Sequence, residues 1–153
     1  AEAYRLVTDR ETYGIMDIGG DDRGAYALGR YVPGILQENN YRMIFVANAS
    51  RPLTRTPEDA LEVMREIEAA CGLRFTDLVN NTNLGNLTTA ETVLASQEYM
   101  EKLSELSGLP IFATTAKADV AAQLPLPDVL PLQLQEKYFD LPSQKPGNRP
   151  LWG

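Results

Sequence analysis

The stretch that decides the fold lies near the start of the chain and reads Tyr13-Gly14-Ile15-Met16-Asp17-Ile18-Gly19-Gly20-Asp21-Asp22-Arg23-Gly24. Its apolar beginning, residues 13–17, predicts a short buried strand, and a helical pattern follows its last glycine. An aspartate at the carboxyl end of such a strand can hold a hydrated Mg²⁺, and glycines beyond it let the backbone approach a phosphate. We therefore expect Asp17 to be a metal ligand and Gly19, Gly20 and Asp21 to be cofactor-binding residues.

Two other interpretations of this stretch stay open. It is also compatible with a structural turn whose aspartate caps the following helix. A loop that binds a dinucleotide or S-adenosylmethionine is a further alternative, but it favours the pattern G-x-G-x-x-G, whereas the glycines here are residues 19, 20 and 24. Titration with NAD and S-adenosylmethionine would test that alternative.

Three more short apolar runs predict strands at residues 43–47, 75–80 and 110–114. Each run is apolar on both faces, which is typical of a parallel sheet covered by helices. Helical patterns separate the runs, so strands and helices alternate as in α/β proteins. The predicted fold class is α/β, with a parallel sheet flanked by helices in a three-layer, Rossmann-type arrangement.

The clearest helix is predicted over residues 57–71, with Thr56 as its N-cap and Gly72 as its end. A second helix is predicted to begin near Thr88, which forms a capping box with Glu91, and to end at Gly108. A weaker helix after Gly24 should break at Pro33-Gly34, and a short one is expected over residues 117–123.

The chain is expected to divide at residue 123. Residues 1–123 form the predicted α/β domain, whereas residues 124–153 hold six of the ten prolines and predict an irregular tail. Tyr138, Phe139 and Trp152 favour packing of this tail on the domain over full extension.

Composition excludes several classes of function. The 153 residues carry a net charge of −7, which disfavours direct binding to nucleic acid. There is no histidine, which removes the Ser-His-Asp and Cys-His mechanisms and nearly all catalytic zinc sites. No apolar run is long enough to span a bilayer. The single cysteine, Cys71, excludes an intrachain disulfide and fits a reducing cytoplasm.

Asparagines close two of the predicted strands. Asn48 follows one strand, and Asn80 and Asn81 end the next. Asparagine amides can recognise the edge of an adenine, although they also commonly form turns after strands. Because ligands of open α/β sheets bind beyond the carboxyl ends of the strands, we expect Asp17, Asn48 and Asn80 or Asn81 to converge on one rim.

These residues resemble those of the MinD/ParA-type deviant P-loop ATPases, a group that also includes the CobQ/CobB-like nucleotide-binding domains. The resemblance covers residues 12–123 and rests on Asp17-Ile18-Gly19-Gly20-Asp21, on residues 43–48, on the helix after Thr56 and on Asn80-Asn81. The nearest likeness is to bacterial ATP-binding proteins.

The resemblance implies a Mg²⁺- and ATP-dependent switch of the SIMIBI-like P-loop NTPase architecture. Asp17 would be the Walker B-like aspartate, Gly19 and Gly20 would belong to the switch II segment, and Asn80 or Asn81 would contact the base. Residues 114–119 match the last base-contacting loop more weakly.

One departure from the family bears on activity. The motif G-x-x-x-x-G-K-[ST] occurs nowhere in the sequence, so the P-loop and its lysine are absent. We therefore expect no appreciable ATP hydrolysis by these residues alone. The missing strand should leave a gap in the sheet, and we expect one of three outcomes. Another polypeptide or a second copy supplies the missing half, the sheet closes differently, or these residues are part of a longer protein whose N-terminal half supplies it. The alternative function is a non-catalytic interaction module whose incomplete sheet is completed by its partner.

Overall fold

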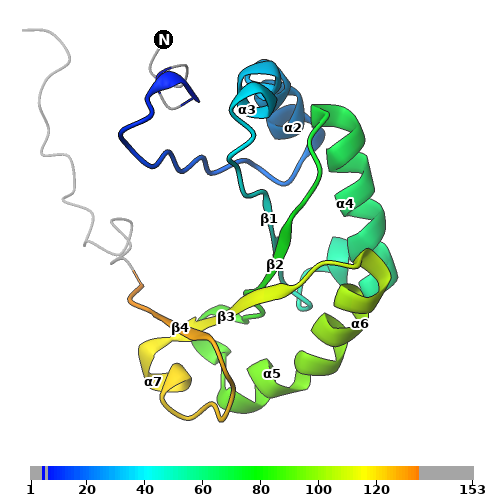
Figure 1. Ribbon diagram of the computed structural model, residues 1–153. Helices are drawn as coiled ribbons and strands as arrows, with labels where there is room; N and C mark the ends of the chain where they lie inside the picture. Colours follow the sequence, from blue (N-terminus) through cyan, green and yellow to red (C-terminus); the bar gives the residue numbers. More distant parts are fainter. Residues whose placement is uncertain (1–4, 6, 135–153) are drawn as a thin grey trace, which may run out of the picture.

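The computed structural model describes residue 5 and residues 7–134 (Figure 1). Its centre is a four-stranded sheet in which every neighbouring pair is parallel and the order is β1-β2-β3-β4. The strands are β1 (Ile44–Ala47), β2 (Asp77–Asn80), β3 (Ile111–Lys117) and β4 (Val129–Leu132). The predicted α/β class and the strands expected at residues 43–47, 75–80 and 110–114 are confirmed.

Helices connect the strands in the order expected of parallel crossover units. They are α2 (Asp22–Gly29), α3 (Val32–Glu38), α4 (Pro57–Cys71), α5 (Ala90–Ala95), α6 (Gln97–Ser107) and α7 (Ala118–Ala121), with short 3₁₀ turns η1 (Pro52–Thr54) and η2 (Gly85–Leu87). In the part of the chain that the structure describes, no helix is long and apolar enough to cross a membrane.

Helix α4 has the ends that its sequence predicts. The Thr56 hydroxyl accepts a hydrogen bond from the Asp59 backbone N–H at 3.1 Å, which satisfies one of the free donors of the first turn. Gly72 ends the helix in the left-handed conformation, at φ 82°, which a glycine adopts without strain. The helix expected after Gly24 does break, but at Arg30 and Tyr31 rather than at Pro33-Gly34, and Pro33 lies in the first turn of α3, where a proline is tolerated.

The predicted capping box is one residue too early. Thr89, not Thr88, is the N-cap of α5, and its partner is Thr92 rather than Glu91. Thr88 instead accepts a hydrogen bond from the Leu84 backbone N–H at 2.8 Å and donates one to the carbonyl of Gly85 at 2.7 Å. The hydroxyl of Thr88 is therefore used to close the η2 turn, which the periodicity of the following helix did not reveal.

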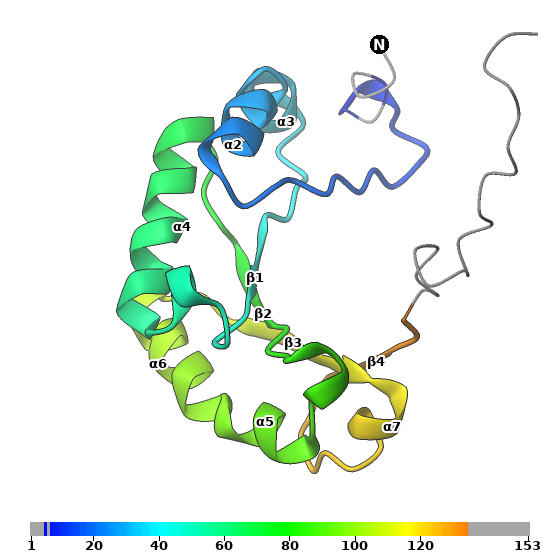
Figure 2. The same cartoon turned by 180° about the vertical axis from the view of Figure 1, so that it is seen from behind.

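The core lies between the sheet and helices α4, α5 and α6, which curve around one side of it (Figures 1 and 2). Its buried members include Phe45 and Leu78 from the strands, Met64 from α4, and Met100 and Leu103 from α6. No helix in the described residues lies along the opposite side of the sheet. The described part of the chain thus has a helix layer on one face, and the third layer of the prediction is not seen in it.

The strand predicted at residues 13–17 does not form. Residues 13–19 have no regular secondary structure, and the side chains of Tyr13 and Ile15 are 102% and 90% exposed. Only Met16 of this run packs against the core. The reason is that an apolar run becomes a strand only when a neighbouring strand accepts its backbone hydrogen bonds, and none is available here.

The segment predicted to be an irregular tail begins with a strand. β4 (Val129–Leu132) pairs with β3, and Leu124 is buried beside α5 and α7. Pro131 occupies the strand, which is tolerated because β4 is the last strand of the sheet. The expectation that Tyr138, Phe139 and Trp152 pack on the domain falls outside the described residues.

The two edges of the sheet differ in a way that matters for assembly. β4 carries a proline, a common protection of a natural edge, whereas β1 has the unprotected apolar sequence Ile44-Phe45-Val46-Ala47. Ala47 directs its carbonyl to the backbone N–H of Asn81 at 2.8 Å. By the alternation of a parallel ladder, the backbone groups of Ile44 and Val46 point away from β2.

Candidate functional site

The carboxyl ends of β1 and β2 form a rim built from asparagine and threonine side chains. Asn48, which follows β1, is joined to the loop after β2 by two hydrogen bonds. Its Oδ1 accepts from the Asn83 backbone N–H at 3.3 Å, and its Nδ2 donates to the Asn83 carbonyl at 3.4 Å. The structure thus brings Asn48, Asn80 and Asn81 together, as expected from parallel neighbouring strands.

Asn80 is the most enclosed member of this rim. Its side chain is fully buried, donates from Nδ2 to Ser96 Oγ at 2.8 Å and accepts at Oδ1 from the Thr82 backbone N–H at 3.0 Å. The Ser96 hydroxyl donates in turn to the carbonyl of Val93 at 2.7 Å. Both ends of the Asn80 amide therefore hold the loop after β2 to the start of α6.

Asn81 is half-buried and more available. Its Oδ1 accepts a hydrogen bond of 2.6 Å from the hydroxyl of Thr115 on β3. Its Nδ2 makes no hydrogen bond among the described residues, so its two N–H donors have no partner there. Of the two asparagines that close β2, Asn81 therefore has the free group that an external ligand needs.

The Asn48 side chain also closes its own loop. Its Oδ1 accepts from the Ser50 backbone N–H at 2.9 Å, which is an Asx-turn of the kind common after strands. Thr54 donates from its hydroxyl to the Asn48 carbonyl at 2.9 Å, and Thr82 accepts from the Ala49 backbone N–H at 3.1 Å. The structural interpretation of this asparagine therefore accounts for its contacts within the protein.

Tyr99 of α6 makes a further hydrogen bond to the loop after β1. The Tyr99 hydroxyl donates to the Thr54 carbonyl at 2.7 Å. Burial, opposed by this hydrogen bond and reinforced by the nearby negative charge of Asp59, raises the pKa of Tyr99 to about 12. The phenol therefore stays protonated, and continues to donate, throughout the physiological range.

The stretch that contains Asp17 does not join this rim. Both views place the segment that leads into α2, drawn in blue, beside the end at which β1 begins, whereas the loops after β1 and β2 lie at the other end (Figures 1 and 2). Because residues 13–17 form no strand, Asp17 is not at a strand end, and it is exposed. The expected convergence of Asp17 with Asn48 and Asn80 or Asn81 is wrong for this structure.

Gly19, Gly20, Asp21 and Gly24 instead build the start of α2. The Asp21 carboxylate accepts from the Gly24 backbone N–H at 2.9 Å as the N-cap of the helix. A methyl group on Gly24 would lie 2.5 Å from the Gly19 carbonyl oxygen, so the backbones approach too closely for a side chain. Gly20 has no atom near its missing side chain and carries no such restriction. The helix-capping alternative thus describes the observed contacts of this turn, with Asp21 as the cap.

The carboxylates of the described residues form no group of three or more that could hold a metal ion. Asp17 is exposed, and Asp21 is engaged at the helix N-terminus. Among the described residues, Asp17 therefore has no set of carboxylates beside it that would complete a metal site.

Hydroxyl side chains organise the rim, and sequence reasoning missed them except for Thr115. That residue falls within the weakly matching residues 114–119, of which 114–117 belong to β3 rather than to a loop. Thr115 and Thr82 are buried, as is Ser96, and each pairs with one of the asparagines or their loops. A signal for Thr115 was present, because two threonines in an otherwise apolar strand indicate polar neighbours on the adjacent strand. Nothing local to Ser96 indicates its role, since its partner Asn80 is sixteen residues away.

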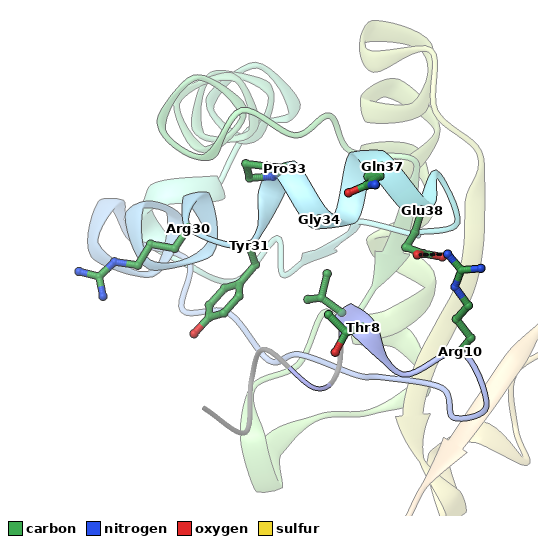
Figure 3. A pocket seen from close by; sticks show the side chains of 9 residues that line it. Thr8, Arg10, Arg30, Tyr31, Pro33, Gly34, Gln37 and Glu38 are labelled. Carbon is green, nitrogen blue, oxygen red and sulfur yellow. Dashed lines mark hydrogen bonds and ion pairs between the residues drawn. The ribbon is translucent and has the colours of Figure 1, made fainter.

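A hollow in the described residues lies elsewhere, between residues 7–10 and α3 (Figure 3). It has a volume of about 380 Å³. Arg10 and Glu38 point toward one another across its edge as an ion pair of 3.1 Å, while Arg30 points away from it. None of the predicted site residues lines this hollow, so it does not bear on the predicted site.

Comparisons with protein families, with curated proteins and with solved structures gave no match to this chain. The family resemblance therefore rests on the residues quoted above. What the described residues establish is an α/β fold with a four-stranded parallel sheet, flanking helices and an asparagine-rich rim at the carboxyl ends of β1 and β2.

Proposed function

We propose that this chain is the C-terminal part of a MinD/ParA-like nucleotide switch that binds Mg²⁺ and ATP, and that another stretch of polypeptide supplies the P-loop. One observation carries the proposal. The free Asn81 amide stands at the carboxyl edge of a parallel sheet, the edge at which ligands of open α/β sheets bind. An amide nitrogen in that place can donate to a ring nitrogen of adenine.

The free edge of β1 supports the same proposal. A P-loop strand that paired there would lie between β1 and residues 13–17, giving that apolar run the neighbour it lacks. Residues 13–17 could then become the strand that their sequence predicts, with Asp17 at its carboxyl end. Asn48 and Asn80 would contribute less than Asn81 to nucleotide binding, because their side-chain amides already form hydrogen bonds within the rim.

The test is Mg²⁺-dependent ATP binding and turnover by the polypeptide made from the whole gene. We expect Asp17→Asn to remove the dependence of turnover on Mg²⁺. We expect Asn81→Ala to weaken ATP binding about tenfold, the size of one lost hydrogen bond to a ligand. Glu66→Gln, a change of an exposed carboxylate on α4, is the matched control for Asp17 and should alter neither quantity.

Failure of that polypeptide to bind ATP at millimolar concentration would refute the proposal. Unchanged turnover in Asp17→Asn would refute the metal role alone. Residues 1–153 by themselves should bind ATP weakly or not at all, since they lack the lysine and backbone amides of a P-loop.

A second candidate, a non-catalytic interaction module, is favoured by the uncovered side of the sheet. Val46 on β1 is 58% exposed in a strand of otherwise buried or half-buried residues, and the Phe112 and Leu130 side chains are also exposed on β3 and β4. Parallel sheets are normally covered on both faces. On this proposal a partner or a second copy pairs with β1 and covers the open side.

The Val46→Lys variant distinguishes a loss of association from a loss of folding. The side chain is largely exposed, so the free energy of unfolding should change by less than about 0.5 kcal/mol. Association, measured by sedimentation equilibrium of residues 1–153, should be lost in Val46→Lys and kept in Leu36→Lys, which alters an exposed leucine of α3. A wild-type chain that stays monomeric at about 0.1 mM, a concentration that populates dimers with micromolar dissociation constants, would exclude the second copy.

A further inference from the structure

One side of the sheet exposes apolar side chains from three of its four strands. Val46 of β1, Phe112 of β3 and Leu130 of β4 are 58%, 47% and 52% exposed. Helices α4, α5 and α6 curve around the other side (Figures 1 and 2). We call the side that carries these three residues the open face.

The strand register shows that Val46 and Leu130 share this face. Residues that pair across a parallel sheet point to the same side, and one such row is Ala47, Asn80, Thr114 and Val129. Ala47 and Val129, the two ends of the row, pack into the clusters beneath the helices. Because side chains alternate along a strand, Val46 and Leu130, each next to this row, point to the opposite side.

Phe112 joins the open face from an irregularity in β3. The pairing of β2 includes Ile111 and Ala113 but skips Phe112. Ile111 packs against the core, which leaves Phe112 on the opposite side. The Arg42 guanidinium lies 4.7 Å from the centre of the Phe112 ring and so helps to fix the ring on this face.

The polypeptide that follows β4 carries apolar side chains suited to this face. Residues 135–153 contain five large ones: Tyr138, Phe139, Leu141, Leu151 and Trp152. The described chain leaves β4 at its orange end, on the side away from α4 and α6 in both views (Figures 1 and 2). The segment therefore starts on the side of the sheet that the helices leave open.

The length of this segment is sufficient to cross the sheet. Neighbouring strands lie about 4.8 Å apart, so β1 is about 14 Å from β4. Leu141 is seven residues beyond Leu134 and can reach about 23 Å in an extended chain. A covalently joined segment also has an effective concentration of millimolar order, which a free partner at micromolar concentration does not reach.

The prolines of the segment favour packing on the face over extension of the sheet. Pro142, Pro146 and Pro150 have no backbone N–H and would interrupt a strand beside β4. A proline-rich chain can instead contact an apolar surface through its side chains, as proline-rich ligands do in aromatic grooves.

Charge distinguishes this segment from a second copy as the occupant. Residues 1–134 contain 11 basic and 19 acidic residues, a net charge of −8, whereas residues 135–153 contain three basic and two acidic residues. The segment is therefore attracted to the rest of its own chain, while a second acidic copy is repelled.

We propose that residues 135–153 cover the open face of their own chain, with their aromatic side chains against Val46, Phe112 and Leu130. The interaction-module candidate assigns the same face to a partner. If that candidate function holds, on which this consequence rests, a partner or a second copy must displace the segment, so residues 135–153 regulate association. The inference requires no nucleotide and is independent of the proposed ATP site.

The experiment uses Trp152, the only tryptophan of the chain, as its reporter. Acrylamide quenching and the emission maximum of the full chain are measured at about 1 μM, where dimers with weaker dissociation constants are sparse. We expect quenching of the folded wild type to be several-fold weaker than that of the urea-unfolded chain. Val46→Lys with Leu130→Lys should raise the quenching constant at least about twofold and shift the emission to the red, because a buried lysine charge opposes an apolar contact.

Two further double variants locate the contact. Tyr138→Ser with Phe139→Ser removes aromatic contacts on the segment side and should expose Trp152 in the same way. Leu36→Lys with Leu53→Lys is the matched control, because both leucines are exposed and lie on α3 and η1 rather than on the sheet. The control should leave the quenching constant of Trp152 within about 20%, as expected of surface substitutions. Circular dichroism of each variant verifies that the fold is kept.

Three results would overturn the proposal. The first is a Trp152 in the folded wild type that is quenched as strongly as in urea, and the second is protection that persists in Val46→Lys with Leu130→Lys. The third is protection that appears only as the concentration rises to about 100 μM, which would assign the face to a second copy. If Val46→Lys abolishes association while Trp152 stays unprotected throughout, the interaction-module candidate holds and this inference alone fails.

Discussion

Replacing Asn80 by alanine should destabilise the fold far more than replacing Asn81, although the two residues are adjacent and identical. Asn80 is fully buried and makes two side-chain hydrogen bonds. Its Nδ2 donates to the Ser96 hydroxyl at 2.8 Å, and its Oδ1 accepts from the Thr82 backbone N–H at 3.0 Å. Without it the buried Thr82 N–H has no acceptor, and the Ser96 hydroxyl keeps only its bond to the Val93 carbonyl.

The magnitude follows from those two losses. A buried donor left without a partner costs about 1–3 kcal/mol, and the lost hydrogen bond to Ser96 adds about 1 kcal/mol. We therefore expect Asn80→Ala to lower the free energy of unfolding by about 2–4 kcal/mol. For a chain of this length, 3 kcal/mol corresponds to a fall of about 6–12 °C in the thermal midpoint.

The assay is urea unfolding followed by circular dichroism at constant pH, with Asn81→Ala and Asn86→Ala measured alongside. Asn81 is half-buried, and the Thr115 hydroxyl that it binds retains the Asn80 carbonyl at 3.3 Å as an acceptor, so Asn81→Ala should cost about 1 kcal/mol. Asn86 is exposed in η2 and should be neutral. If Asn80→Ala proved as mild as Asn86→Ala, the structural role assigned to Asn80 would be wrong.

Two further perturbations test the turn before α2 and the bracing of the loop after β1. Gly24→Ala places a methyl group 2.5 Å from the Gly19 carbonyl oxygen and should lower the free energy of unfolding by about 1–3 kcal/mol. Gly20→Ala is the control, because the space around Gly20 is open, and it should change the free energy of unfolding by less than about 0.5 kcal/mol. Equal effects of the two substitutions would contradict the close approach of Gly24 to Gly19. The pKa of Tyr99 is raised to about 12 in the folded protein, so the folded state holds this proton more tightly than the unfolded state. Stability from this group is complete below about pH 10, the ordinary tyrosine pKa, and is lost as the pH rises toward 12, so alkaline urea titrations should show a steeper loss for the wild type than for Tyr99→Phe. Parallel slopes for the two proteins would contradict the assigned environment of Tyr99.

Local sequence was sufficient for most of the secondary structure. Helix α4 begins and ends where Thr56, Pro57 and Gly72 place it, because caps and helix breakers act over one turn of chain. The strands β1, β2 and β3 were visible as short apolar runs between helices, and the parallel arrangement follows from that alternation. The rim could also be anticipated in part, since Asn48 and Asn81 follow neighbouring parallel strands.

Tertiary structure decided what depends on partners distant in the sequence. Residues 13–17 have the composition of a buried strand yet form none, because a strand requires a neighbour to receive its backbone hydrogen bonds. β4 lies in a proline-rich segment with a weak local preference for strand, so the sequence did not predict it. It forms because it pairs with β3. Asn80 is enclosed and Asn81 keeps a free amide nitrogen because of their partners Ser96 and Thr115. Only the packing of the sheet and helices brings these partners within hydrogen-bonding distance.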